Sequence, residues 1–195
     1  MRRTALVAAL FAAFLLIPST ASAQSAQLWS LQFSGLGSSP FGGELDNISL
    51  GVGWEAQLRV NPSVWSFGFG VEQTFHDVNQ RDDRSVTLLG GFFEPRLVIL
   101  VGSESAAPYL SARFAVSQFS ATEGELETSA TGFTVNGGGG VLIRMSDRVN
   151  LDLGATVGFK QLGEGPDLFN QNVILDWGSG ANAIGRVGLA IGLGG

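Results

Sequence analysis

The sequence contains no cysteine, and among its 195 residues there are only one histidine and one lysine. Without cysteine there is no disulfide framework, no thiolate metal site and no cysteine nucleophile. Charged residues make up 14% of the chain, and 17 acidic residues outnumber 11 basic ones. We expect no nucleic-acid partner, because binding nucleic acid requires clustered lysine and arginine. We also expect no cofactor and no metal ion.

Long apolar runs are missing after the amino end. Arg2 and Arg3 precede an apolar run over residues 5–17, and the small residues Ala-Ser-Ala follow at 21–23. The run is shorter than the roughly 20 residues that a spanning helix needs, and this order of segments is typical of a secretory signal peptide. We predict a cleaved signal peptide over residues 1–23. Residues 24–195 then form one domain, with 9 basic residues against 17 acidic ones.

Glycine is abundant, at 28 residues, and apolar residues alternate with small or polar ones along most of the chain. Alternation with a period of two residues is typical of β-strands with two different faces. Short turns at 61–63, 102–107 and 146–148 take turns with longer links at 35–47, 77–85, 119–130 and 160–180. The predicted strands lie near residues 27–34, 48–60, 64–76, 86–101, 108–118, 131–145, 149–159 and 181–193.

One row of each predicted strand holds large apolar side chains, such as Trp54 and Leu58, and the other row holds glycine, serine and isolated charges. A closed barrel with its apolar rows facing lipid satisfies every backbone group inside a membrane. Short turns at one end and longer loops at the other are typical of such barrels. We therefore predict an all-β fold, an eight-stranded antiparallel up-and-down transmembrane β-barrel. A periplasmic lipocalin-like binder, with the same strands turned inside out, is the alternative.

The polar rows of the strands would line the lumen. An eight-stranded barrel is just wide enough for side chains to fill it, and buried charges persist when they are paired. We predict a packed lumen cross-linked by ion pairs, with a small pore as the alternative. The predicted network comprises Glu55, Arg59, Glu72, Glu94, Arg96, Arg113, Arg144, Asp152 and Arg186.

Aromatic residues lie next to several predicted strand ends, which is typical of the aromatic girdles of membrane barrels. The long links hold most of the acidic residues together with Lys160, and we expect them to be solvated. The predicted aromatic rim comprises Trp65 and Tyr109, which follow short turns, and Phe75, Phe119 and Phe159, which border long links.

Three stretches of the chain resemble the outer membrane protein β-barrel family, the small eight-stranded barrels that include the transmembrane domain of outer membrane protein A. The resemblance spans residues 24–195. It implies a Gram-negative outer membrane location, folding by the barrel-assembly machinery, and a role in envelope integrity, adhesion or lipid contact. Because Pro95 removes a ladder hydrogen bond inside a strand, we expect a bulge there. The stretches are Glu94-Pro95-Arg96-Leu97, Pro108-Tyr109-Leu110 and GGGGVLIRMSDRVNLDLGATVGF from Gly137 to Phe159.

The predicted function is that of a non-catalytic, porin-like envelope protein, monomeric and surrounded by outer membrane lipid. A lipid-modifying hydrolase or acyltransferase is the rival hypothesis, because some small outer membrane barrels are such enzymes. That chemistry needs a nucleophile activated by a base within reach. His76 shares a predicted strand face with Glu72, so a pair is conceivable, but no His-x-Ser element is present. We expect His76 to be solvated near a loop.

Overall fold

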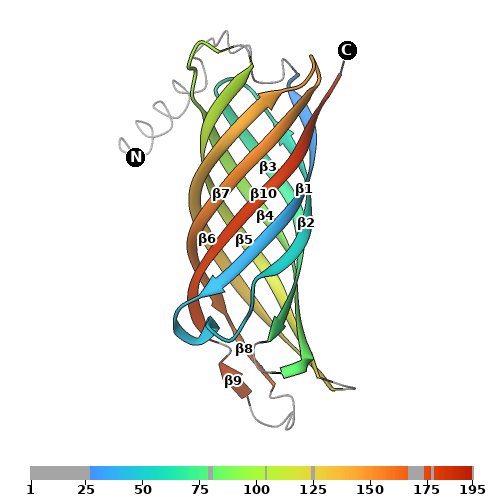
Figure 1. Ribbon diagram of the computed structural model, residues 1–195, viewed down its shortest axis with the longest axis vertical. Helices are drawn as coiled ribbons and strands as arrows, with labels where there is room; N and C mark the ends of the chain where they lie inside the picture. The colour runs from blue at the N-terminus through green and yellow to red at the C-terminus, as the bar shows by residue number, and fades with distance from the viewer. Residues whose placement is uncertain are drawn as a thin grey trace, which may run out of the picture.

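The computed structural model describes residues 27–78, 81–103, 105–123, 126–166, 174–176 and 178–194. They form a closed antiparallel barrel of eight strands, in the order β1-β10-β7-β6-β5-β4-β3-β2, and a separate hairpin, β8-β9 (Figure 1). The expected signal peptide lies outside the described residues. The elements are β1 (Trp29–Phe41), η1 (Gly43–Leu45), β2 (Gly51–Val60), β3 (Trp65–Val78), β4 (Arg81–Val98), β5 (Ala106–Glu123), β6 (Leu126–Arg144), β7 (Val149–Leu162), β8 (Glu164–Pro166), β9 (Ile174–Asp176) and β10 (Ser179–Leu193).

The barrel closes where the last strand pairs with the first. Trp29 lies opposite Leu193 at one end of this pair, and Phe41 lies opposite Ala181 at the other. The end with Trp29 also carries the connections 61–64, 99–105 and 145–148, and we call it the turn end (Figure 1). The opposite end, with the connections 42–50 and 163–178, is called the loop end. The eight-stranded up-and-down barrel predicted from the alternation is confirmed.

The strands are longer at the loop end than the sequence predicted. β5 and β6 run to Glu123 and Leu126, which pair with each other, and β3 and β4 run to Val78 and Arg81. The predicted long links at 77–85 and 119–130 are therefore almost entirely strand, and that prediction was wrong. The outward row of these strands stops being apolar close to the ends of the predicted strands. The alternation continues beyond that point with polar side chains outside.

Pro95 lies in β4 without causing the predicted bulge. The pairing between β4 and β5 keeps one register from Phe93–Phe114 to Arg96–Ser111, on either side of the proline. Because proline has no N–H group, the ladder is interrupted at Pro95 and at the residue before it. No extra residue is inserted into the strand, so the inward and outward rows keep their faces along β4.

The described elements outside the barrel wall are short. η1 is a 3-10 helix of three residues in the connection between β1 and β2. No helix in the described part of the chain is long and apolar enough to cross a membrane. In the connection between β7 and β10, β8 pairs with β9 and places Glu164 opposite Asp176. Both short elements lie at the loop end (Figure 1).

Candidate functional site

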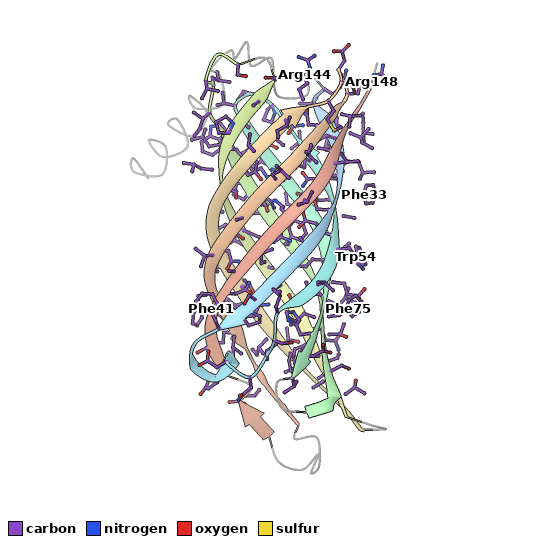
Figure 2. All side chains as sticks on the ribbon, viewed as in Figure 1. Phe33, Phe41, Trp54, Phe75, Arg144 and Arg148 are labelled. Carbon is purple, nitrogen blue, oxygen red and sulfur yellow. The ribbon has the colours of Figure 1, made fainter. Side chains whose placement is uncertain are left out.

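The outer wall of the barrel is apolar over most of its height (Figure 2). Trp54 and Leu58 are each 43% exposed, and Phe69, Leu110 and Val187 are more exposed still. A water-soluble protein keeps most such side chains in its core. The prediction that the apolar rows face outward is therefore confirmed. The lipocalin-like alternative is excluded because it needs these rows inside.

The apolar band has the height of the hydrocarbon core of an outer membrane. On β3 the band runs from Trp65 to Phe75, ten positions further along the strand. A rise of about 3.3 Å per residue and a strand tilt of about 40° give a height of about 25 Å, as is usual for outer membrane barrels. Phe41 on β1 lies at the level of Phe75 (Figure 2). These two phenylalanines mark the boundary of the band on the side of the loop end, which is at the bottom of Figure 2.

Beyond this boundary the polarity of the wall reverses. Over residues 85–87 of β4, 118–122 of β5 and 129–131 of β6 the outward positions are serine, threonine and glutamine, while the inward positions between them, such as Val86, Phe119 and Ala130, are apolar. Polar residues outside and apolar residues inside are typical of a β-sheet with one face in water and the other packed on a core. These inward residues form one buried apolar cluster with Leu45 of η1 and Leu162 of β7, and we call this cluster the apolar cap. It comprises Leu45, Val86, Leu88, Phe119, Ala121, Ala130 and Leu162.

Leu45 belongs to η1 and enters the apolar cap from the connection between β1 and β2. Its side chain is only 1% exposed. The backbone N–H of Ser179 donates a hydrogen bond of 2.8 Å to Glu44 Oε2, which holds η1 against β10. Further along, the N–H of Ser49 donates to the carbonyl oxygen of Asp77 at 2.9 Å. The connection is thus fixed at two points, with Leu45 closing the loop end of the lumen.

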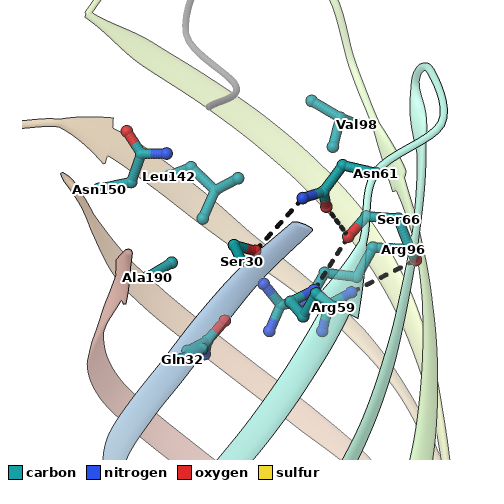
Figure 3. A pocket seen from close by; sticks show the side chains of 10 residues that line it. All are labelled: Ser30, Gln32, Arg59, Asn61, Ser66, Arg96, Val98, Leu142, Asn150 and Ala190. Atoms are coloured by element: carbon teal, nitrogen blue, oxygen red, sulfur yellow. Dashed lines mark hydrogen bonds between the residues drawn. The ribbon is translucent and has the colours of Figure 1, made fainter. Parts of the chain in front are cut away.

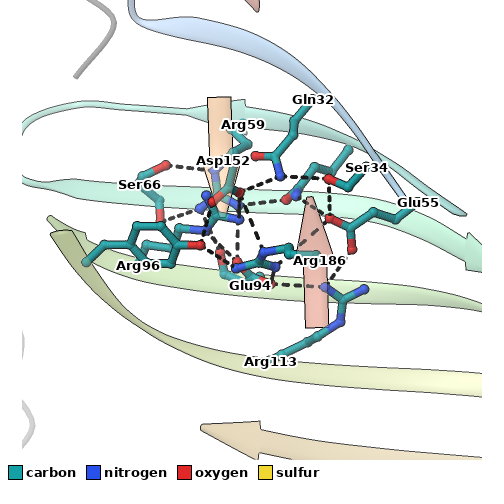
Figure 4. A network of polar contacts seen from close by, with 12 residues as sticks. Gln32, Ser34, Glu55, Arg59, Ser66, Glu94, Arg96, Arg113, Asp152 and Arg186 are labelled. Atoms are coloured by element: carbon teal, nitrogen blue, oxygen red, sulfur yellow. Dashed lines mark hydrogen bonds and ion pairs between the residues drawn. The ribbon is translucent and has the colours of Figure 1, made fainter. Parts of the chain in front are cut away.

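The middle of the lumen is filled by a charge network centred on Glu94 (Figure 4). Glu94 comes from β4 and is 0% exposed. Its Oε1 lies 2.5 Å from Arg96 Nε and 3.5 Å from Arg59 Nη1. Its Oε2 lies 2.5 Å from Arg186 Nη1 and 3.1 Å from Arg113 Nη1. One carboxylate therefore joins arginines from four different strands.

Asp152, from β7, is the second acidic centre of the network. Its Oδ1 accepts a hydrogen bond of 2.6 Å from the hydroxyl of Tyr109, and its Oδ2 accepts one of 2.7 Å from Gln32 Nε2. Arg96 Nη2 lies 2.9 Å from the same Oδ2, in an ion pair whose geometry is not that of a hydrogen bond. The guanidinium of Arg96 also lies 4.4 Å from the centre of the Tyr109 ring. These contacts tie β1, β4, β5 and β7 together.

Arg113 connects Glu94 to the remaining two acids. Its Nη1 lies 2.7 Å from Glu55 Oε2, and its Nη2 forms an ion pair with Glu72. Ser34 and Gln57 each donate a hydrogen bond to Glu55 Oε1, at 3.0 and 3.1 Å. The small size of the neighbouring wall residues leaves room for this crowding. A Cβ atom added to Gly154 would lie 2.5 Å from the hydroxyl of Tyr109 and 2.7 Å from Arg186 Nε.

Of the nine residues predicted for the charge network, Arg144 is the one that lies elsewhere. It is the last residue of β6, so its side chain reaches the turn-end rim, where Nη2 lies 2.9 Å from Asp147 Oδ1. Its assignment to the lumen was wrong. The residues that the structure brings together are Glu55, Arg59, Glu72, Glu94, Arg96, Arg113, Asp152 and Arg186.

The predicted aromatic rim divides into two groups. Phe75 and Phe159 are exposed on the outer wall, and Trp65 stacks on the outward Phe67 with ring centres 6.3 Å apart. Tyr109 and Phe119 are buried inside the barrel, so assigning them to the rim was wrong. Both occupy inward positions of β5. The alternation along the strand determines which way their side chains point, and closeness to a strand end does not.

Lys160 was expected in a solvated loop, but it points into the barrel and is buried. β7 continues to Leu162, and the even-numbered residues of this strand face inward. With Lys160 inside the lumen and Arg144 at its rim, the buried lumen side chains that the structure describes comprise five basic groups, Lys160 included, and four acidic ones. Extending the predicted strand 149–159 by one residue would have placed Lys160 on the inward face. Sequence reasoning also left Gln32 and Ser34 out of the predicted network, although they lie in the same inward row.

The turn end of the lumen contains a small cavity of about 20 Å³ (Figure 3). That volume has room for about one water molecule. Arg59 and Arg96 lie on its side toward the charge network, and Val98 and Leu142 lie among its apolar lining. Arg59 Nε donates to Ser66 Oγ at 2.9 Å, and Ser66 in turn donates to Asn61 Oδ1 at 2.6 Å. A chain of hydrogen-bonded side chains thus borders the cavity on one side.

His76 does not form the pair that a hydrolase would need. It is 2% exposed and faces inward, so the expectation that it is solvated was wrong. Its Nδ1 lies 3.0 Å from the carbonyl oxygen of Ser49, and its Nε2 lies 3.0 Å from Thr74 Oγ1. Glu72 is paired with Arg113 instead. Over the described ranges no group of three or more His, Asp or Glu side chains is placed to hold a metal ion.

No family model and no curated protein matches the sequence. Among solved structures, the fold is similar to that of Neisserial surface protein A, with 14% sequence identity and a TM-score of 0.57 over 85% of this chain and 97% of that one. It is also similar to Ail, the attachment invasion locus protein of Yersinia pestis, with 12% identity and a TM-score of 0.50 over 84% of this chain and 95% of that one. Both are small eight-stranded outer membrane barrels. The chain therefore has the fold to which the sequence resemblance pointed.

Proposed function

We propose that this chain is a non-catalytic, monomeric barrel of the outer membrane, with a sealed lumen and a structural role in the envelope. The observation that carries the proposal is the Glu94 network, which fills the lumen below the apolar cap. The apolar band about 25 Å high and the fold shared with outer membrane barrels support the location. The closed wall supports a monomer, since no strand edge of the band lacks a partner.

In this proposal the turn end faces the periplasm and the loop end faces outward, the usual orientation of short turns and longer loops. Residues 1–23 act as the export signal. The partners are outer membrane lipid around the band and the barrel-assembly machinery during folding.

The charge network seals the barrel because an ion could pass only by separating buried pairs. Breaking a buried ion pair costs about 3–5 kcal/mol, since it leaves an uncompensated charge. Glu94 alone contacts four guanidinium groups. Opening a path would separate several of these contacts at once, which makes a steady conducting state too costly to be populated.

Conductance across planar bilayers tests the seal. The full chain is refolded in detergent and checked by its shift in gel mobility on boiling, which identifies closed barrels. We expect no steady openings from the wild type or from Leu45→Ala, because the charge network remains intact when the cap is trimmed. Steady large openings from the wild type would refute the sealed lumen. Openings from Leu45→Ala alone would assign the seal to the apolar cap instead.

Cell fractionation tests the location, and lipid analysis tests the absence of catalysis. We expect the protein in the outer membrane fraction, whereas release by osmotic shock would contradict the proposal. The acylation pattern of lipid A should be the same in cells that express the wild type and in cells that express His76→Ala. A difference between them would restore the enzyme hypothesis.

A further inference from the structure

A patch of uncharged polar side chains covers the outside of the barrel between the apolar band and the loop end, on β4, β5 and β6. All seven side chains point outward, and none forms a hydrogen bond with another part of the chain that the structure describes. They are hydroxyls and carboxamides, which both donate and accept hydrogen bonds. We call the patch the hydroxyl face. It comprises Ser85, Thr87, Gln118, Ser120, Thr122, Ser129 and Thr131.

Strand pairing brings these side chains together into one surface. Ser85 lies opposite Thr122 on the neighbouring strand. In the next outward row Thr87 lies opposite Ser120, which lies opposite Ser129. Directly opposed side chains on one face of a sheet are about 5 Å apart. The hydroxyl face is therefore a continuous array across three strands.

The hydroxyl face continues the lipid-facing wall without a break. The outward residues before it on the same strands are Leu89, Val116 and Phe133, all exposed in the apolar band. An acyl chain packed on these residues must place its head group against the hydroxyl face. From Leu89 to Ser85 strand β4 advances about 10 Å along the barrel axis toward the loop end, at 3.3 Å per residue and a tilt of about 40°. This height passes through the head-group layer and beyond it.

We infer that the hydroxyl face binds the sugars of an outer-leaflet glycolipid, a ligand that rests on the proposed outer membrane location. Sugar hydroxyls pair well with neutral groups that both donate and accept. A phosphate would instead select arginine or lysine, and none of the seven residues is charged. Around β1 and the connection to β2, the described outward residues at the boundary include the large apolar side chains Phe41 and Leu50 instead. The glycolipid is thus held on one side of the barrel.

The test uses the full folded chain in detergent micelles with two probes, lipid A alone and lipid A that carries its core oligosaccharide. The variant Thr87→Val/Thr122→Val/Thr131→Val removes one hydroxyl from each strand and keeps the β-branched shape. The control is Ser39→Ala, on the outward row of β1, away from the hydroxyl face. A second variant, Ser85→Ala/Ser120→Ala/Ser129→Ala, repeats the test in case the first does not fold. Each protein is first checked for its mobility shift on boiling.

We expect the wild type and Ser39→Ala to bind the sugar-bearing probe more tightly than lipid A. The triple variants should lose about tenfold in affinity for that probe only, because each neutral hydrogen bond contributes about a two- to tenfold factor. Equal affinity of the wild type for both probes would overturn the inference, and so would triple variants that bind like the wild type. These results would leave the proposed location intact. Recovery of the protein in the soluble fraction of cells would instead refute the location, and the inference with it.

Discussion

Replacing Glu94 by glutamine tests whether the charge network holds the barrel together. The substitution keeps the shape of the side chain but removes the carboxylate that faces Arg59, Arg96, Arg113 and Arg186 at 3.5, 2.5, 3.1 and 2.5 Å. Among the buried lumen side chains that the structure describes, the excess of basic over acidic groups then rises from one to two. Because breaking a buried ion pair costs about 3–5 kcal/mol, we expect the free energy of unfolding to fall by about that amount.

Urea titration of the protein in vesicles, followed by tryptophan fluorescence, measures this change. Linear extrapolation to zero urea yields the free energy of unfolding. The matched control is Asp147→Asn, which removes the carboxylate of an ion pair whose acidic side chain is 96% exposed. The control should cost no more than about 1 kcal/mol. If Glu94→Gln and Asp147→Asn differ by less than about 0.5 kcal/mol, the network is not a stabilising element and the reasoning fails.

Three further substitutions probe the apolar cap, the membrane band and the packing of the lumen. Leu45→Ala should lower the free energy of unfolding by about 2–5 kcal/mol, because it leaves a cavity in the apolar cap. It should also speed hydrogen exchange at the loop end of β4 and β5, and unchanged exchange would show that the cap does not stabilise these strands. Val71→Arg should lower the free energy of unfolding in vesicles by about 2–4 kcal/mol, because it places a charge near the middle of the apolar band. Ser120→Arg, between the band and the loop end, should lower it by only about 0–1 kcal/mol, and equal losses would contradict the assigned boundary of the band. Gly154→Ala should lower the free energy of unfolding by about 1–3 kcal/mol, because the new methyl group overpacks the lumen. Gly37→Ala, whose new Cβ meets no atom within 4 Å, should lower it much less, and urea titration compares the two variants.

The alternation of residues predicted the barrel and most of its lumen, because the direction of a strand side chain is a local property. Successive residues point to opposite faces whatever the rest of the chain does. Once Trp54 and Leu58 are placed outside, Glu55 and Arg59 must lie inside, and the structure places them there. The same rule would have placed Tyr109 and Phe119 inside. Their assignment to the rim relied on closeness to a strand end, which does not determine a face.

The heights of residues along the barrel could not be predicted in the same way. Arg144 and Glu94 both occupy inward rows, but one lies at the turn-end rim and the other at the centre of the network. The difference depends on the stagger between strands, which the pairing of distant segments sets. The same limit applies to β4, β5 and β6 beyond the membrane boundary. There the strands continue through sequence that was predicted as loop.

The sequence by itself determined the fold class and the two faces of the wall, since both follow from a two-residue period that each strand carries alone. Only the tertiary structure decided which acids and bases meet. Arg113 reaches Glu55, Glu72 and Glu94 on three other strands, and no local pattern encodes those distances. It also decided that the lumen ends in the apolar cap, because Leu45 is brought there by a connection that contains no barrel strand. Contacts across a closed cylinder depend on circumference and stagger, and these exist only after every strand has paired.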